Sequence, residues 1–452
     1  MRRVLLAIAV LMFMAAPLRA AEPPERHVVL ISVDGLAAFL LDDPQATLPN
    51  IRQLAREGAF APQGMGVSNP SVTWPNHTSL VSGVHPERHG VLFNGVAERK
   101  GPGLPVQVDP RRDQQDLAHV PLLFDVFKKS GLTSAAINWP CTRGSTSLED
   151  NFPDVPEAID HSTPRLLDEL VAEGILSQEQ RQGFARVNIL VRDDIWTNAA
   201  CHLLRKRKPA FLCLHLLNVD SVHHRYGPQT QAGYSAVAAA DAMVGRVLRT
   251  LDETGLRERT TVIIVSDHGF ASIPKTIQPN VALRRAGLLT VENSRIASAR
   301  AHVIPEGGIG MLYLTVRETK DEDRKRVLEL FRNAEGIEQI LEPADFAKYR
   351  LPHPDDNPRM ADLILVGKDG YGFSATATGD ELVVPSTGTL GTHGFLSTWG
   401  RMNATFVASG AGIRTGATVS KMENIDVAPT IAKLLGIELP HADGRLLSEI
   451  LK

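Results

Sequence analysis

The chain has 452 residues, of which 43% are apolar, and a formal net charge of -3 at pH 7. A chain without an overall basic charge is not expected to hold nucleic acid polymers electrostatically, so we exclude them as partners. The length is too great for one small core, and it predicts a large domain with a substantial insertion, or two domains.

The first 20 residues have the pattern of a secretory signal peptide (1–20). Two arginines precede an apolar run over residues 4–16, and residues 18–20 form a small-residue cleavage site. The run is too short to span a bilayer, and no later segment predicts a membrane span. We therefore expect a mature chain that begins near Ala21 and is exported to the periplasm or the extracellular space.

The mature chain contains three cysteines, Cys141, Cys201 and Cys213. In an oxidising compartment an odd number allows at most one disulfide among them. Cys201 and Cys213 lie in apolar helix and strand patterns, so we expect both to be buried thiols.

Strand and helix patterns alternate along most of the chain. Continuous apolar runs predict strands at 27–33, 132–138, 210–217, 261–265 and 404–409. Helical spacing predicts helices at 47–58, 121–131, 193–208, 232–254, 426–435 and 443–451. This alternation predicts an α/β fold with a mainly parallel central sheet flanked by helices, and a ligand site along the carboxyl edge of the strands.

Between residues 279 and 385 the pattern changes to short alternating strands, a charged helix near 320–333 and turns rich in proline and aspartate. We interpret 279–385 as an inserted cap region. Residues 21–278 and 386–452 then form the main, ligand-binding domain, and neither end of the insertion is marked by a clear linker.

The stretch from Asn69 to Gly83 contains hydroxyl, amide and imidazole side chains that a core would not bury without partners. We expect residues 76–79 to cap a helix that runs through Leu80 and Val81. Thr73 then lies just before a positive helix end, where an anion is favoured. This placement suits a nucleophile that attacks phosphorus.

Several aspartate and histidine residues follow predicted strands and predict a metal site. They are Asp34, Asp220, His224, Asp267, His268 and His393. Asp220 and His224 are four residues apart, so they share one face of a helical turn. Three carboxylates and three imidazoles suit zinc, whereas Mg²⁺ or Ca²⁺ prefers oxygen ligands. With Thr73, these ligands are too many for one tetrahedral ion and predict two Zn²⁺ per chain.

Five motifs in order resemble the nucleotide pyrophosphatase/phosphodiesterase family of the alkaline phosphatase superfamily, over about residues 27–440. They are Ser-Val-Asp34-Gly, Thr73-Trp-Pro-Asn-His, Asp220-x-x-x-His224-x-x-Gly-Pro228, Ser-Asp267-His268-Gly and Gly-x-His393-Gly-Phe. The resemblance implies an alkaline-phosphatase-like fold and hydrolysis of small phosphate diesters, most of all nucleotide-like ones.

By this resemblance Thr73 is the nucleophile and becomes a phosphothreonine, and Asn94 binds a non-bridging oxygen of the phosphoryl group. One zinc is held by Asp34, Thr73, Asp267 and His268, and the other by Asp220, His224 and His393. Trp74 and Asn94 are the expected substrate-binding residues.

The sequence also departs from the family pattern near the substrate. His223 stands where glycine is frequent, so either His223 or His224 is the ligand, with the spacing to Gly227 favouring His224. Trp74 replaces a frequent phenylalanine, and its indole either stacks on a flat leaving group or packs beneath the loop. After His393 and Gly394, the segment Phe395-Leu-Ser stands where Tyr-Asp-Asn is common.

The motifs also bear on alternative functions of the chain. A sulfatase of this superfamily needs a Cys-x-Pro-x-Arg type segment, which Cys141-Thr-Arg-Gly does not supply. The enzyme alternative is a phosphonoacetate-hydrolase-like C–P bond hydrolase, and the other is a non-catalytic binder of metal or phospho-ligands. A mere binder has no need of a nucleophile such as Thr73. The motifs leave open the leaving group (nucleoside, sugar or lipid) and the oligomeric state.

Overall fold

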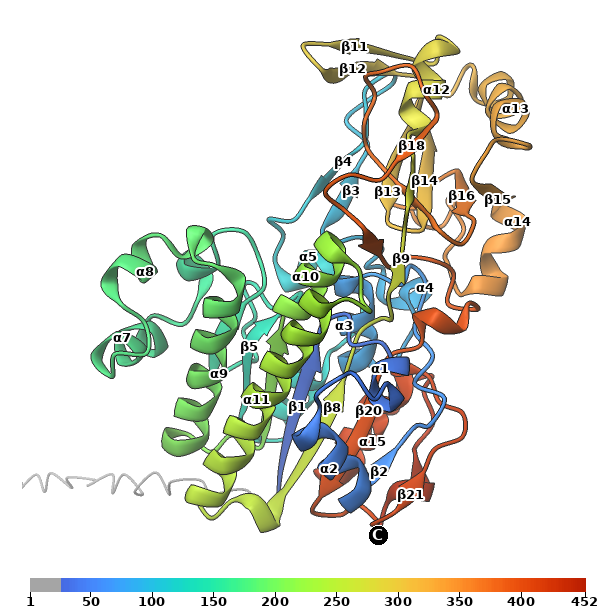
Figure 1. Ribbon diagram of the computed structural model, residues 1–452. Coiled ribbons are helices and arrows are strands. Elements are labelled where there is room, and N and C mark those ends of the chain that lie inside the picture. Colours follow the sequence, from blue (N-terminus) through green and yellow to red (C-terminus); the bar gives the residue numbers. More distant parts are fainter. Residues whose placement is uncertain (1–25) are drawn as a thin grey trace, which may run out of the picture.

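The structure, a computed structural model, describes residues 26–452, and the predicted signal peptide (1–20) lies outside them. An eight-stranded sheet in the order β21-β2-β20-β8-β1-β7-β5-β6 forms the centre (Figure 1). Its strands are β1 (His27–Val33), β2 (Ala59–Phe60), β5 (Ser134–Trp139), β6 (Asp150–Pro153), β7 (Phe211–Leu216), β8 (Thr260–Val265), β20 (Phe406–Gly410) and β21 (Ala417–Thr418).

The sheet is mainly parallel, as predicted. Strand β1 pairs in parallel with β7 and β8, and β5 continues the parallel array to β7 and β6. Of the strands described in this sheet, β20 alone runs antiparallel to its neighbours, β8 and β2. The carboxyl ends of β1, β7 and β8 therefore meet at one edge.

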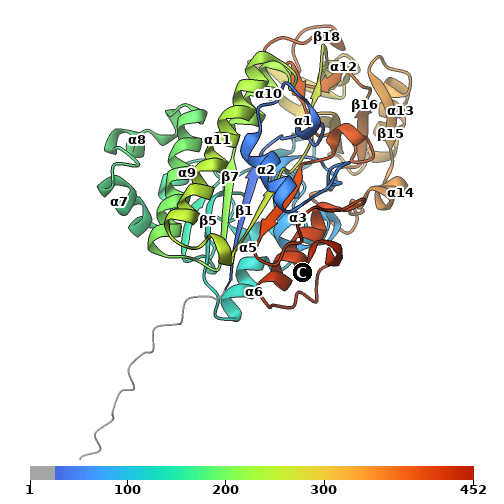
Figure 2. The same cartoon turned by 60° about the horizontal axis from the view of Figure 1, so that its bottom comes forward.

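Helices cover both faces of the sheet. The helices of the chain before and after the predicted cap are α1 (Phe39–Asp42), α2 (Pro49–Glu57), α3 (Thr73–Ser82), α4 (Pro86–His89), α5 (Gln114–Leu117), α6 (Leu123–Lys129), α7 (Pro164–Ala172), α8 (Gln178–Gln182), α9 (Ile189–Lys206), α10 (Asn218–Tyr226), α11 (Gln231–Glu253) and α15 (Val427–Leu434). Figure 2 shows α9 and α11 side by side.

Alternate side chains of β1 enter two separate cores, because successive residues of a strand point to opposite faces. Val29 and Ile31 pack in the core that contains α9 and α11. Val28 and Leu30 pack in the core that contains α3, α6 and α15. Burial on both faces explains why the strand is apolar throughout.

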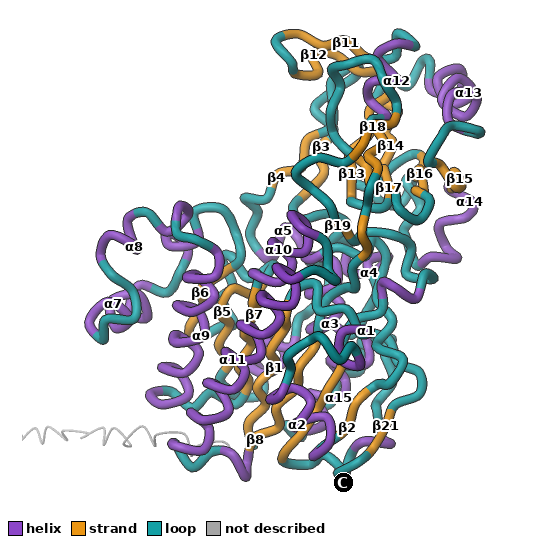
Figure 3. Tube along the Cα trace, viewed as in Figure 1, coloured by secondary structure: helices purple, strands orange, loops and turns teal. Residues whose placement is uncertain are grey.

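The region predicted as a cap contains its own antiparallel sheet, β13-β14-β16-β15, at the carboxyl end of the central strands (Figure 3). Its elements are α12 (Pro279–Arg285), β11 (Leu289–Glu292), β12 (Arg295–Ala299), β13 (Ala301–Glu306), β14 (Ile309–Leu314), α13 (Lys320–Phe331), β15 (Ile337–Leu341), α14 (Pro343–Phe346), β16 (Leu363–Gly367), β17 (Tyr371–Phe373) and β18 (Val383–Pro385).

Segments outside 279–385 also contribute to this region. Strand β10 (Lys275–Ile277) pairs with β17 and β18. Leu92 and Phe93 share a core with Met311 and Tyr313 of β14. The segment between Phe93 and α5 contains the short antiparallel strands β3 (Val96–Glu98) and β4 (Gln107–Asp109). A separate pair is formed by β9 (Ala271–Ser272) and β19 (Gly391–Thr392).

The predicted closing helix at 443–451 is wrong, since only a 3-10 turn forms at Ser448–Ile450. The backbone N–H groups of Asp443 and Gly444 both donate to Gly83 O, which holds this segment against the end of α3. Gly444 also lies so close to Ile425 that a Cβ atom would be 2.0 Å from its carbonyl oxygen. Tertiary packing therefore overrides the helical pattern here.

Cys201 and Cys213 are buried free thiols, as predicted, and Cys141 is also buried and free. Within residues 26–452 no helix has the length and apolar character needed to cross a membrane.

Candidate active site

The predicted ligand residues come together at the carboxyl edge of the central sheet. Asp34 follows β1, and Asp267 and His268 follow β8. Asp220 and His224 lie on α10, which begins just after β7. His393 directly follows β19. Because β1, β7 and β8 are adjacent and parallel, side chains distant in sequence meet at one place.

The ligand atoms form two adjoining groups. In the first, His268 Nε2 lies 3.3 Å from Asp34 Oδ1 and 3.2 Å from Asp267 Oδ2. In the second, Asp220 Oδ1 lies 3.4 Å from His224 Nε2 and 3.6 Å from His393 Nε2. The rings of His268 and His393 stack with 3.6 Å between centroids. Ligand atoms of Asp220, His268 and His393 also lie within 4.8 Å of one another, so His268 is within reach of both groups.

Backbone carbonyls orient the three imidazoles. The Nδ1 atom of His224 lies 3.0 Å from Gly391 O, and that of His393 lies 3.0 Å from Ser71 O. The Nδ1 atom of His268 lies 3.1 Å from Gly269 O. A carbonyl can only accept, so each Nδ1 donates, and each neutral ring presents the lone pair of Nε2. This is the arrangement that orients histidine toward a metal.

The buried polar atoms in this cluster lack partners. Asp34 Oδ1, Asp220 Oδ1, Asp267 Oδ2 and His268 Nε2 are buried and accept or donate no hydrogen bond. Leaving such groups unpaired costs free energy, and buried carboxylates in particular need compensation. Bound cations would satisfy all four atoms, so the donor set fits metal ions.

The pKa shifts agree with a cation site. Burial raises the pKa of Asp34 well above its usual value, and repulsion from Asp267 adds to this effect. Burial lowers the pKa of His393 to about 3 and that of His268 to about 4, so both rings are neutral at pH 7. Burial alone would lower the pKa of His224, but attraction to Asp220 outweighs it and the net shift is upward.

The geometry favours His224 over His223 as the ligand. His224 Nε2 faces Asp220, whereas both ring nitrogens of His223 are buried without a partner. The His223 ring packs edge-on against Phe270, with 5.2 Å between centroids. His223 therefore belongs to the packing beneath α10.

Helix α3 begins at Thr73, so the prediction that residues 76–79 cap its start is wrong. These polar side chains lie inside the helix, and three of them bond back to the preceding turn. Asn76 Nδ2 donates to Val72 O at 2.9 Å. His77 Nδ1 lies 2.9 Å from Thr73 O, and Thr78 Oγ1 donates to Trp74 O. Thr73 is nevertheless at the positive end of the helix, with 7% of its surface exposed.

Asn94 and Trp74 are held beside Thr73. Asn94 Oδ1 accepts the Trp74 backbone N–H at 2.9 Å, which leaves the Asn94 amide N–H groups free to donate. Trp74 is only 4% exposed, and its indole N–H donates to Asp154 Oδ2 at 3.1 Å. This burial favours the packing role for Trp74 over stacking on a substrate.

Two histidines of the site were not predicted. His215, near the carboxyl end of β7, has its Nε2 atom 3.0 Å from Asp34 Oδ2 and its Nδ1 atom 2.9 Å from Asn138 O. His77 Nδ1 lies 3.6 Å from Asp267 Oδ2. The sequence signal for His215 is a lone polar residue in the otherwise apolar run Phe211–Leu216, a position that requires a buried partner.

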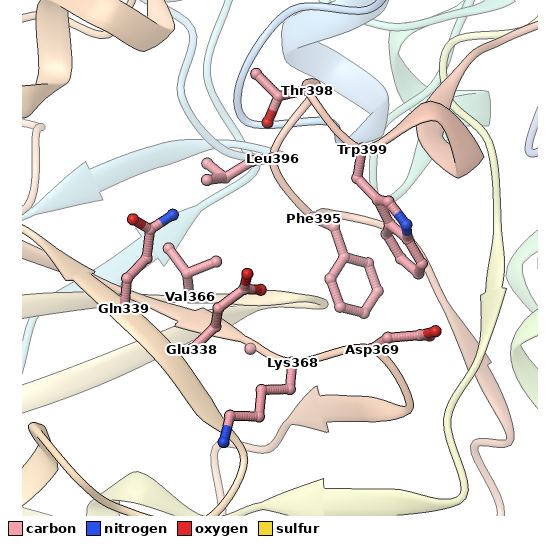
Figure 4. Close-up of a pocket in the computed structure, with 10 residues that line it drawn as sticks. Glu338, Gln339, Val366, Lys368, Asp369, Phe395, Leu396, Thr398 and Trp399 are labelled. Carbon is pink, nitrogen blue, oxygen red and sulfur yellow. The ribbon is translucent and has the colours of Figure 1, made fainter.

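A crevice of about 570 Å³ borders the segment that follows His393. Figure 4 shows Phe395 and Trp399 on one side of it, and Glu338 and Lys368 from the cap strands and the adjoining turn on the other. None of its lining residues is a predicted metal ligand. The crevice is therefore a boundary between cap and main sheet and not part of the ligand cluster.

The family model of type I phosphodiesterases / nucleotide pyrophosphatases matches residues 28–396. The chain belongs to this family. The match contains every predicted ligand from Asp34 to His393. Members of the type I phosphodiesterase family are hydrolases of phosphodiester bonds, and the chain is accordingly a hydrolase of this kind. It resembles several ectonucleotide pyrophosphatase/phosphodiesterase proteins.

It is 25% identical over 415 residues to human ectonucleotide pyrophosphatase/phosphodiesterase family member 1, covering 90% of this chain and 40% of the human protein. It is 26% identical over 428 residues to bis(5'-adenosyl)-triphosphatase enpp4 of Xenopus laevis, covering 93% of this chain and 80% of the frog protein. The chain thus spans less than half of the human relative.

Solved structures support the fold. Murine ectonucleotide pyrophosphatase/phosphodiesterase 5, in an inactive form in complex with AMP, superposes with a TM-score of 0.71 at 17% identity, covering 94% of this chain and 100% of that one. The human counterpart gives a TM-score of 0.67 at 17% identity, covering 91% of this chain and 95% of that one. The predicted alkaline-phosphatase-like α/β architecture is confirmed at the level of the fold.

Proposed function

We propose that the protein is an exported two-zinc phosphodiesterase and nucleotide pyrophosphatase that hydrolyses phosphate diesters through a phosphothreonine on Thr73. The observation that carries this proposal is the set of three imidazoles whose Nε2 atoms face unpartnered carboxylate oxygens at the edge of the sheet. Such a set is costly to a fold unless metal ions occupy it.

The residues divide between two metal sites in this proposal. Asp34, Thr73, Asp267 and His268 hold one ion, and Asp220, His224 and His393 hold the other, with His268 close enough to contact both. The mixture of imidazole nitrogen and carboxylate oxygen suits zinc better than magnesium or calcium. When bound, two such ions lower the pKa of the nucleophile and stabilise the leaving oxygen.

Thr73 Oγ1 attacks phosphorus, the bond from phosphorus to the first ester oxygen breaks, and the substituted phosphoryl group is transferred to Thr73. Water then cleaves the Thr73–phosphorus bond and restores the hydroxyl. The N-terminus of α3 favours the negative phosphoryl group during both steps. The free amide N–H of Asn94 donates to a non-bridging oxygen as charge develops.

Nucleotide-like diesters are the proposed substrates. The structure of murine ectonucleotide pyrophosphatase/phosphodiesterase 5 contains AMP and is inactive with one threonine replaced by alanine. The frog relative is a bis(5'-adenosyl)-triphosphatase. These names favour a nucleotide substrate and a catalytic threonine in this chain.

Export is supported by the signal pattern at 1–20 and by relatives named as ectoenzymes. We also propose 279–385 as a cap inserted into a catalytic domain of 21–278 and 386–452.

Trapping of the intermediate tests the proposal. Rapid acid quench of the zinc-loaded protein with p-nitrophenyl thymidine 5'-phosphate should give a thymidylyl group on the peptide that contains Thr73. Thr73→Ala should keep both metal ions, because it removes one weak ligand, and should lose turnover and the adduct. Thr73→Ser is the matched control and should retain both in reduced amount. Undiminished turnover by Thr73→Ala would remove Thr73 as the nucleophile.

A further inference from the structure

A second cavity, of about 600 Å³, is lined by Asn138, by Asp154 and by residues of helix α9. Asp154 lines it and accepts the indole N–H of Trp74, the residue that follows Thr73. Asn138 also lines it, and its Nδ2 atom donates to His215 O at 3.2 Å. His215 in turn contacts Asp34. Hydrogen-bonded contacts therefore connect the lining of this cavity to Trp74, beside Thr73, and through His215 to Asp34.

One wall of this cavity is formed by helix α9. Arg192 and Trp196 are four residues apart, so they lie on the same face of the helix. The Arg192 guanidinium carbon lies 5.8 Å from the centroid of the Trp196 ring. Trp196 packs against Phe184 and Phe152, with 5.7 and 6.1 Å between ring centroids. This wall of the cavity therefore carries the Arg192 guanidinium over the ring of Trp196, which is itself packed against two other aromatic rings.

Two hydrogen-bond donors in this wall lack acceptors. Arg192 Nε and Trp196 Nε1 are both buried and have no partner. Arg192 also forms no ion pair with any residue of the described chain, 26–452, whereas Arg181, which lines the same cavity, is paired with Asp168 at 2.8 Å. A buried donor without an acceptor destabilises the fold, so an oxygen-bearing ligand would be stabilised here.

Burial also destabilises the positive charge of Arg192. It lowers the pKa of Arg192, and the carboxylates of Asp154 and Asp193 only partly oppose this effect. The Asp154 carboxylate is already engaged by the Trp74 indole.

We propose that this cavity receives one organic substituent of the phosphodiester, and that Arg192 selects substituents that carry an anionic oxygen group such as a carboxylate or a phosphate. The inference rests on the proposed phosphodiesterase function and adds the chemical class of the substrate. Arg192 acts in binding and takes no part in bond breaking. A guanidinium can bind two oxygens of a carboxylate or phosphate at once, which a lysine cannot do.

A matched pair of substrates tests this inference. Hexyl p-nitrophenyl phosphate and 5-carboxypentyl p-nitrophenyl phosphate share the leaving group and the length of the second substituent. The unmodified enzyme should show a kcat/KM about tenfold higher for the carboxylated diester, since a charge-assisted hydrogen bond is formed only with that substrate. A 6-phosphohexyl diester in a third arm shows whether phosphate or carboxylate is preferred.

Arg192→Gln should abolish the preference, chiefly by raising KM for the carboxylated diester, and should change kcat/KM for the hexyl diester by less than about twofold. Arg192→Lys should retain part of the preference. Arg181→Gln is the matched control, because Arg181 lines the same cavity with its charge paired, and it should keep the full preference.

The possible results distinguish a failure of the proposed Arg192 role from a failure of the proposed phosphodiesterase function. If the unmodified enzyme hydrolyses both diesters equally well, or if Arg192→Gln lowers both rates by the same factor, the role of Arg192 in selection is overturned while phosphodiesterase activity stands. If the zinc-loaded enzyme hydrolyses none of the diesters, the proposed function itself is overturned, and this inference with it.

Discussion

The Nε2 atom of His215 lies 3.0 Å from Asp34 Oδ2, in the buried interior of the central sheet. The Nδ1 atom of the same ring lies 2.9 Å from Asn138 O. Asp34 therefore meets His215 with one carboxylate oxygen, while its other oxygen faces the ligand cluster without a partner. His215 is a positioning residue that orients Asp34 toward the proposed metal.

His215→Asn should weaken metal binding at the Asp34 site by about 10- to 100-fold, because outer hydrogen-bond partners orient metal ligands to that extent. Titration with a competing zinc chelator measures the affinity. Turnover should recover at saturating zinc if His215 acts only through Asp34. His302→Asn is the matched control, since His302 is another buried histidine, located on β13 of the cap. Equal metal affinities for the His215 variant and the unmodified protein would contradict this role.

Much of the cluster of candidate ligand residues could be predicted because the pattern is local. Asp34 and Asp267 each follow a continuous apolar run, and the end of a buried parallel strand is where functional loops begin. The spacing of Asp220 and His224 is a property of one helical turn. Such signals need only a few neighbouring residues, and the sequence contains them in full.

The remaining features depend on contacts between distant residues. His215 lies within an apolar strand, and only the pairing of β1 with β7 brings it to Asp34. The chain near its end is held by Gly83, more than 300 residues earlier, which accepts the backbone N–H groups of Asp443 and Gly444. The burial of Trp74 likewise depends on Asp154, which belongs to the loop after β6. No local pattern carries this information.

His393→Ala should reduce the zinc content from two ions to one and lower turnover by at least roughly a hundredfold, because it removes a direct ligand whose Nε2 faces Asp220. Elemental analysis of the purified protein measures the ions, and hydrolysis of bis(p-nitrophenyl) phosphate measures turnover. His223→Gln is the control and should keep two ions, since its ring nitrogens contact no ligand. Fully active protein with one ion or none would refute the two-metal proposal.

Asp193 should make folding stability fall as the pH rises. Its carboxylate accepts the N–H groups of Leu217 and Asn218 at the start of α10, but burial dominates and raises its pKa from 3.8 to about 7. Between these values the folded chain keeps a proton that the unfolded chain has released, so stability is lost as pH increases through this range, by up to about 4 kcal/mol.

Asp193→Asn should remove that slope, because the amide does not titrate. Urea denaturation of both proteins between pH 4 and pH 8, with a metal chelator present throughout, measures the difference in slope. A constant offset between the two curves is expected, since the amide oxygen replaces a carboxylate that accepts two N–H groups. Parallel curves over the whole range would show that the Asp193 pKa is not raised in the folded protein.

The enzyme should prefer phosphate diesters to monoesters. A monoester carries an additional negative charge, and an enzyme that stabilises it is expected to place a cationic side chain or a further metal beside the phosphoryl group. In the sequence after Thr73 the first cation is Arg88, which donates to Asp443 Oδ1 at 2.5 Å and to His441 O at 3.0 Å. The charge of Arg88 is therefore paired with Asp443, in the carboxyl-terminal segment of the chain. The side chain beside Thr73 is instead the neutral amide of Asn94.

A single neutral donor suits the single charge of a diester. We therefore expect kcat/KM for bis(p-nitrophenyl) phosphate to exceed that for p-nitrophenyl phosphate by at least roughly tenfold, which is about 1.4 kcal/mol of transition-state stabilisation. Both substrates have the same leaving group and are to be measured with one zinc-loaded preparation. Asn94→Ala should lower both rates, whereas Arg88→Gln should leave the ratio unchanged. Equal or reversed values for the unmodified enzyme would indicate a monoesterase, because only a site with an additional cation beside Thr73 would favour the doubly charged phosphoryl group.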